Sequence, residues 1–185
     1  MKKDFVGKKD ASHPSIGFSS AVVKGRLAQG FAGDVDGFLQ FSLSVQNRRK
    51  SRAGYALGNH VEAVLIAQGV THKREATTEK RNGPDFLFPG EVAYHDANQP
   101  SAGLRMLAVK TTCKDRWRQV LAEADRIVPK HLLTLEPSIS AAQTTEMQGS
   151  ALQLVVPAAL LPSYSAAQRD WLMTFAGFLD VVRAV

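Results

Sequence analysis

The spacing of apolar residues changes along the chain and predicts helices first, then alternating strands and helices. Apolar residues near one face predict a short helix over residues 35–45 and a stronger helix over residues 53–68, which Gly69 ends. The basic run 48–52 is expected to separate these two helices. Residues 1–33 are rich in Gly, Ser and Lys with only short apolar fragments, which predicts an arm or linker with little regular structure.

The apolar period shortens after residue 70, which indicates strands. A loosely alternating stretch over residues 71–78 and an apolar run over residues 85–88 flank the turn signal Asn82-Gly83-Pro84 and predict an antiparallel pair. The remaining predicted elements are a loop around residues 94–100, strands over residues 104–111, 131–135 and 152–156, and helices over residues 114–127, 140–147 and 165–184. Strands that alternate with helices favour parallel pairing through right-handed crossovers. The predicted fold class is therefore α/β, with a central mixed sheet flanked by helices on both faces.

Length and composition favour a single globular domain over residues 34–185. The chain has 185 residues, of which 44% are hydrophobic, so it is long enough for one core and too short for two full domains. It contains no apolar run near the roughly 20 residues that span a bilayer, and its N-terminal residues lack the apolar stretch of a signal peptide. We therefore expect a cytoplasmic protein without a membrane partner.

The single cysteine restricts the kinds of metal site that the chain can form. Cys113 has no second cysteine to pair with, which excludes an internal disulfide and a cysteine-rich metal site. Any metal is then expected on oxygen ligands, which favours Mg²⁺, with Mn²⁺ or Ca²⁺ as ions that could occupy the same site.

The charge distribution points to double-stranded DNA as the partner. The formal charge is +6, which suits a polyanion but is also found in ordinary basic enzymes. The basic residues gather in clusters, two of which flank the candidate chemistry described next, and this clustering favours nucleic acid. The residues predicted to contact the DNA backbone are Arg49, Lys50, Arg52, Lys80, Arg81 and Arg118.

A carboxylate and a lysine mark the ends of two neighbouring predicted strands. Asp85 opens one strand directly after Pro84, and Lys110 closes the next. Taken alone, Asp85 is typical of a turn residue and Lys110 of a lysine at a sheet edge. Together they can meet at one end of the sheet, where a carboxylate can hold Mg²⁺ and a lysine can orient or activate the attacking water. This pairing is typical of metal-dependent phosphodiester cleavage.

The second acid of such a nuclease is missing from its usual position. Nucleases with a Pro-Asp motif usually carry Asp or Glu two residues before the lysine, where this chain has Ala108. Glu123 is the candidate replacement, because the predicted helix places it at the rim of the apolar stripe, facing the same way as Arg116. A solvated helix glutamate is the alternative interpretation. The predicted metal ligands are Asp85 and Glu123, and Glu62 is a weaker candidate for an auxiliary acid.

Three charged residues follow the lysine and have the donors and acceptors of base readers. Lys114 and Arg116 can donate to O6 and N7 of guanine, and Asp115 can accept from N4 of cytosine. A solvent-exposed helix start is the alternative explanation for this triplet.

The stretches that carry this chemistry resemble one known family. Residues 85–89, 94–96 and 109–121 resemble the C-terminal catalytic domain of EcoRII-type restriction endonucleases, and the likeness continues through residues 130–135 and 155–157. The resemblance implies the PD-(D/E)XK restriction-endonuclease-like fold, in the variant whose second acid has moved into the helix after the lysine.

The resemblance also implies an activity and a set of site residues. It implies Asp85, Lys110 and Glu123 as the catalytic set, with Glu62 as an auxiliary acid. It further implies that residues 114–116 read the outer C·G pairs of a CC…GG site and that the central base pair is extruded. The expected activity is Mg²⁺-dependent type II cleavage of double-stranded DNA at 5′-CCWGG before the first C, although relatives also recognise CCGG or CCNGG.

Two other functions stay open at this point. The basic clusters fit a DNA-binding module without catalysis equally well, and a repair or Holliday-junction nuclease would share the fold and the metal. A two-fold symmetric site favours a homodimer, but a monomer that nicks the two strands in turn is also possible.

Overall fold

The computed structural model describes residue 30, residues 34–79 and residues 82–185, and the chain divides into two compact units. The first unit comprises residues 1–47 and the second residues 48–185. The arm predicted over residues 1–33 lies outside the described residues except for Gly30. The unit boundary falls within the domain predicted over residues 34–185, and that single domain stays a prediction.

The long helix α2 (Val35–Ala67) is continuous, so the break predicted at the basic run 48–52 is wrong. Arg and Lys are among the better helix formers, so a run of them at exposed positions continues a helix rather than interrupting it. The predicted end is confirmed, because Gly69 follows the helix at φ +65°, a conformation that glycine adopts without strain. Neither α2 nor any other described helix is long and apolar enough to cross a bilayer.

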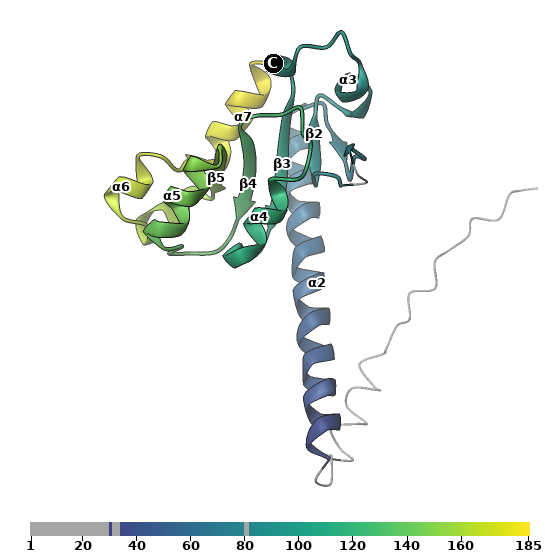
Figure 1. Ribbon diagram of the computed structural model, residues 1–185, viewed down its shortest axis with the longest axis vertical. Helices are drawn as coiled ribbons and strands as arrows, with labels where there is room; N and C mark the ends of the chain where they lie inside the picture. Colours follow the sequence, from purple (N-terminus) through teal and green to yellow (C-terminus); the bar gives the residue numbers. More distant parts are fainter. Residues whose placement is uncertain (1–29, 31–33, 80–81) are drawn as a thin grey trace, which may run out of the picture. The chain divides into compact units, whose positions relative to one another are not determined.

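A mixed sheet of six strands organises the described part of the second unit (Figure 1). In order across the sheet, the strands are β1 (Lys73–Arg74), β2 (Phe86–Phe88), β3 (Arg105–Lys110), β4 (Lys130–Thr134), β5 (Leu152–Val156) and β6 (Met173–Thr174). The pairs β1–β2 and β2–β3 are antiparallel, and β3 to β6 run parallel to one another. The predicted antiparallel pair followed by a parallel series is confirmed.

Short helices and 3-10 turns connect the strands, and a final helix follows β6. They are α3 (Glu91–His95), η2 (Ser101–Gly103), η3 (Lys114–Arg116), α4 (Trp117–Val120), α5 (Ala141–Gly149), η4 (Ala158–Ser163), α6 (Ala166–Arg169) and α7 (Phe175–Arg183). The helix predicted over residues 114–127 is wrong after Val120, where turns replace it. The helix predicted over residues 165–184 is wrong in its middle, because Met173 and Thr174 pair with β5 as a strand. A turn of helix, α3, stands in the predicted loop around residues 94–100.

Helices cover both faces of the sheet, as predicted (Figure 1). Two clusters of buried hydrophobic residues form the core of the described part. The first cluster packs α3, α4 and α5 against one face of the sheet. Its helix residues Tyr94, Trp117, Val120 and Met147 lie among the strand residues Met106, Ala108, Leu132 and Leu154. The second joins α2 and α7 to the other face, with Val61, Leu65, Phe178 and Val182 packed among Leu107, Leu133 and Val155. Neighbouring residues of one strand thus belong to different clusters, which is the alternation that a sheet buried on both faces requires.

Removing a buried side chain from the centre of this sheet should destabilise the protein. Leu132 on β4 is fully buried, so Leu132→Ala is expected to lower the free energy of unfolding by about 2–5 kcal/mol in urea denaturation. Leu135, which is 42% exposed, serves as the matched control and should lose clearly less on the same substitution. Equal losses for the two variants would contradict the described packing.

Candidate active site

The antiparallel register of β2 and β3 brings Asp85 and Lys110 together. Phe86 lies opposite Leu107, so the residue before β2 lies beside the end of β3. The Asp85 Oδ2 atom accepts a hydrogen bond from the Lys110 Nζ atom at 3.0 Å and another from the Val109 backbone N–H at 2.6 Å. The expected meeting of the two charged groups at one end of the sheet is therefore observed, while their roles stay a prediction.

Both charged groups remain reachable from solvent. The side chain of Asp85 is 38% exposed and that of Lys110 is 18% exposed. Each therefore has part of its surface covered by the sheet and part open to a ligand. An ion pair that no ligand could reach from solvent would only contribute to the stability of the fold.

Glu123 lies in the turn after α4, close enough to Asp85 and Lys110 to interact with both. Burial raises the pKa of Glu123 to about 7, and the negative charge of Asp85 adds to that increase. The ammonium groups of Lys110 and Lys130 act in the opposite direction. The Glu123 Oε2 atom is buried and has no hydrogen-bond partner among the described residues.

The two carboxylates fit a divalent cation. Asp85 and Glu123 raise each other's energy when both are ionised, and a cation between them would relieve that repulsion and give the Glu123 Oε2 atom a partner. Within the described residues no group of three or more His, Cys, Asp or Glu gathers. Mg²⁺ suits such a site, because it usually keeps several waters and takes one or two carboxylates plus phosphate oxygens.

Glu62, the predicted auxiliary acid, is held by an arginine. Its Oε2 atom lies 2.5 Å from the Arg74 Nη1 atom, which also donates to Asn59 Oδ1 at 2.8 Å. No hydrogen bond or ion pair of the described residues joins Glu62 to Asp85 or Glu123. Its contribution to a metal site stays a prediction.

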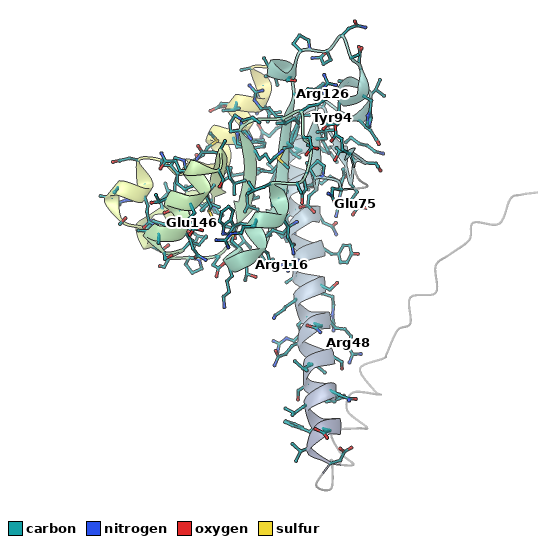
Figure 2. The ribbon with its side chains drawn as sticks, in the orientation of Figure 1. Arg48, Glu75, Tyr94, Arg116, Arg126 and Glu146 are labelled. Carbon is teal, nitrogen blue, oxygen red and sulfur yellow. The ribbon has the colours of Figure 1, made fainter. Side chains whose placement is uncertain are left out.

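The predicted base-reading segment begins immediately after β3 and is fixed by a glutamate. The Glu136 Oε2 atom accepts hydrogen bonds from the backbone N–H of Cys113 at 2.5 Å and of Lys114 at 3.2 Å. Lys114 has φ +27°, which an L residue rarely adopts, and this anchor holds it there. Lys114 and Arg116 are exposed, and Figure 2 shows Arg116 where the chain enters α4. The side chain of Asp115 lies outside the described part.

The residues predicted to contact the DNA backbone fall into three groups. Arg49, Lys50 and Arg52 are exposed on α2. Arg118 lies 2.5 Å from Glu146 of α5 and packs over the Trp117 ring, and Figure 2 labels Glu146 on that helix. Lys80 and Arg81 lie outside the described residues.

Comparison with known proteins decides the family. The sequence model of the family described as EcoRII C terminal matches residues 17–179, which is most of the chain. The chain belongs to the EcoRII C-terminal family. It is 51% identical over 154 residues to the type II restriction enzyme EcoRII of Escherichia coli, a match that covers 83% of this chain and 38% of the relative. The chain thus spans well under half the length of that enzyme, and the predicted resemblance is confirmed.

Solved structures with the same fold agree with this membership. Metal-depleted Ecl18kI in complex with uncleaved, modified DNA superposes with a TM-score of 0.67 at 20% identity, covering 91% of this chain and 58% of that one. The complex of the restriction endonuclease PspGI with substrate DNA gives a TM-score of 0.67 at 17% identity, covering 88% and 70%. At these identities the likeness concerns the fold, which is the predicted PD-(D/E)XK restriction-endonuclease-like fold.

Glu136 is a residue near the candidate site that the sequence pattern does not predict. It follows β4 and lies beside the predicted base-reading segment because β4 pairs with β3, with Lys110 opposite Thr134. The weak signal in the sequence was a charged residue closely following a fully buried strand. Its carboxylate accepts hydrogen bonds from two backbone N–H groups, which indicates that Glu136 shapes the start of the segment 114–116.

Removal of the Glu136 carboxylate should leave two backbone donors without their partner. Glu136→Ala is expected to lower the free energy of unfolding by roughly 1–3 kcal/mol in urea denaturation. Glu146→Ala removes a glutamate whose side chain is 53% exposed in its pair with Arg118, and should cost about 0–1 kcal/mol. A Glu136 variant as stable as the Glu146 variant would argue against the anchoring role.

Proposed function

We propose that this chain is the catalytic part of a type II restriction endonuclease that acts in the cytoplasm on double-stranded DNA. It hydrolyses phosphodiester bonds at 5′-CCWGG, before the first C, with Mg²⁺ as the cofactor. Its 51% identity with EcoRII supports the class of enzyme, and the site residues support the chemistry.

The convergence of Asp85, Lys110 and Glu123 is the observation that carries this proposal. The Asp85 and Lys110 groups lie 3.0 Å apart. Glu123 interacts electrostatically with both, and its buried Oε2 atom has no hydrogen-bond partner among the described residues. A structural ion pair needs only the first two. The third acid, held close although burial opposes its ionisation, is what a site for a cation and a phosphate requires.

Lys110 positions the reacting groups. Its ammonium has three protons, and the one that is donated to Asp85 Oδ2 fixes its direction. The other two can bond the attacking water and a phosphate oxygen, which orients the water and stabilises the negative charge that develops on the phosphate. The Asp85 carboxylate also accepts from the Val109 N–H, so it is oriented toward Lys110 in the absence of DNA.

Asp85 and Glu123 are the residues that would hold Mg²⁺. When bound, the ion supplies Lewis-acid stabilisation of the phosphate and lowers the pKa of the attacking water. Glu62 is proposed as an auxiliary acid, which would require it to leave Arg74.

Lys114, Asp115 and Arg116 are proposed as readers of the outer C·G pairs. The segment follows Lys110 closely, so cutting and reading are joined in one short stretch of chain. The exposed basic residues of α2, together with Lys80, Arg81 and Arg118, would contact the phosphates. The two-fold symmetry of the outer pairs favours a homodimer on the DNA, with the central base pair extruded.

Cleavage of a DNA of known sequence, followed by mapping of the ends, tests the proposal. With Mg²⁺ we expect fragments that end before the first C of CCWGG, and none after chelation of the metal. Asp85→Asn, Lys110→Met and Glu123→Gln should each lower the rate about 1000-fold, since each removes several kcal/mol of transition-state stabilisation.

Asp180→Asn is the matched control for these variants, because this aspartate is 78% exposed and pairs with Arg183 of its own helix α7. It should cut at the parent rate. DNA binding without any cleavage would support a non-catalytic module instead, and nicks or smears without site preference would support a repair or junction nuclease.

Loss of a base-reading side chain should relax specificity at one base pair. Arg116→Gln is expected to reduce discrimination at an outer C·G pair by about 1–3 kcal/mol, or roughly 5–150-fold in relative cleavage rates. The measurement compares rates on duplexes with single substitutions in the site. Arg49→Gln, on α2, should weaken binding to all duplexes alike and leave the discrimination unchanged. The role of Arg116 would be rejected if it behaved as Arg49 does.

A further inference from the structure

The backbone around Glu123 is organised by one buried lysine. The carbonyl oxygens of Glu123, Ala124 and Ile127 converge on the Lys130 Nζ atom, at 2.5, 2.9 and 3.2 Å. An ammonium has three protons, so three carbonyls satisfy it completely. These three contacts hold the turn that follows α4 in a compact loop.

Lys130 is unusual because its charged side chain is buried. It opens β4 and is only 7% exposed, and desolvation lowers its pKa while Asp125, Glu123 and Glu79 act against that decrease. Its backbone N–H donates to the Ala151 carbonyl at 3.0 Å, beside the first residue of β5. The sheet therefore fixes the backbone of Lys130, and the three carbonyls fix its ammonium. A buried charge of this kind is stable only when its hydrogen bonds are complete.

A second set of hydrogen bonds holds the same turn from the opposite side. The Thr78 Oγ1 atom accepts from the Ala124 backbone N–H at 3.3 Å, and the Asn82 side chain donates to the Ala122 carbonyl at 3.3 Å. Thr78 and Asn82 are joined by the Thr78 hydroxyl, which donates to the Asn82 carbonyl. The segment that leads into Asp85 is thus tied directly to the turn that carries Glu123.

The neighbouring acid and tyrosine complete this support. The Glu79 Oε2 atom accepts from the Asp125 N–H at 3.2 Å, and the Tyr94 hydroxyl donates to Glu79 at 2.6 Å. Arg126 donates to the Tyr94 backbone and lies over its ring, and Figure 2 shows the two side chains next to each other. Ala124 has φ +49°, so the turn adopts a conformation that an alanine rarely takes without such support.

These hydrogen bonds fix the backbone on both sides of Glu123. The peptide group that follows Glu123 is held at both of its polar atoms, because its carbonyl accepts from Lys130 and its N–H, that of Ala124, donates to Thr78. The preceding peptide group is held as well, since the Ala122 carbonyl accepts from Asn82 and the Glu123 N–H donates to the Val120 carbonyl at 3.1 Å. The Cα of Glu123 therefore lies between two anchored peptide groups. We propose that Lys130 and Thr78 are positioning residues that fix the Glu123 carboxyl beside Asp85 and Lys110, so that the cation finds both acids already in place. This inference rests on the proposed function, in which these acids hold the metal.

Manganese binding by the full chain without DNA tests the inference separately from cleavage. Mn²⁺ also prefers oxygen ligands, and the paramagnetic resonance signal of the free ion reports how much is bound. Loss of a residue that supports a metal ligand typically costs 10–100-fold in metal affinity, and we expect a loss of about 10-fold for Thr78→Val and more for Lys130→Met. Thr78→Ser keeps the acceptor oxygen and should bind within about twofold of the parent.

Matched controls separate positioning from a general effect on the fold. Thr145 bonds a carbonyl of its own helix α5, and Lys73 is exposed on β1, so Thr145→Val and Lys73→Met should bind Mn²⁺ as the parent does. Circular dichroism and thermal unfolding establish that each variant is folded. If Lys130→Met does not fold, the comparison of Thr78→Val with Thr78→Ser carries the test.

The outcomes distinguish this inference from the proposed function. Parent binding that Asp85→Asn abolishes, with Thr78→Val weakened and Thr78→Ser unchanged, supports both. Binding that depends on Asp85 but is equal in the parent and Thr78→Val overturns the positioning role and leaves the nuclease assignment intact. A folded parent that binds no Mn²⁺ through Asp85 overturns both. In cleavage assays, positioning further requires that Thr78→Val raise the Mg²⁺ concentration for half-maximal rate more than it lowers the rate at saturation.

Discussion

The antiparallel register between β2 and β3 is the constraint on which the candidate site depends. It sets the first residue of β2 opposite Leu107, and so brings Asp85 to the end of β3 beside Lys110. Because neighbouring strand residues face opposite sides, a slip of one position would send the two groups to different faces of the sheet. All three residues of β2 (Phe86–Phe88) are fully buried, which resists that slip. The same strand register therefore sets both the packing of the core and the geometry of the site.

A fold that buries a carboxyl without a partner accepts a cost in stability. Glu123 bears this cost, as its raised pKa indicates, and its buried Oε2 atom finds no hydrogen-bond partner in the described part of the chain. Polar groups in such a position usually find a hydrogen bond, and those that do not are concentrated where a ligand completes them. The surrounding bonds from Lys130 and Thr78 hold the backbone firmly, so the unsatisfied group is confined to the side chain that would meet the ligand.

Local patterns predict β2 to β5 well, because each of these strands contains an apolar run. They miss β6, whose two residues lie inside the helix predicted over residues 165–184. The same patterns placed Asp85 and Lys110 at strand ends, which was enough to expect their meeting. They failed where distant groups decide the backbone. The helix predicted over residues 114–127 ends at Val120, and the turn that replaces it is stabilised by Lys130, which lies beyond it in the chain and binds its carbonyls. The sequence therefore predicts a helical position for Glu123, whereas the structure places it in a turn that still brings it near Asp85 and Lys110. A lysine at the start of a strand gives no sign in the sequence that it is buried.

The central claim is that Asp85 and Glu123 form one cation site next to Lys110. A crystal structure with Mn²⁺ and a CCWGG duplex, with the metal located by its anomalous scattering, tests it most directly. The account predicts a peak within about 2.0–2.6 Å of an oxygen from each carboxylate and in contact with a DNA phosphate. A peak that touches neither acid, or a Glu123 side chain turned away from Asp85 in the complex, would contradict it.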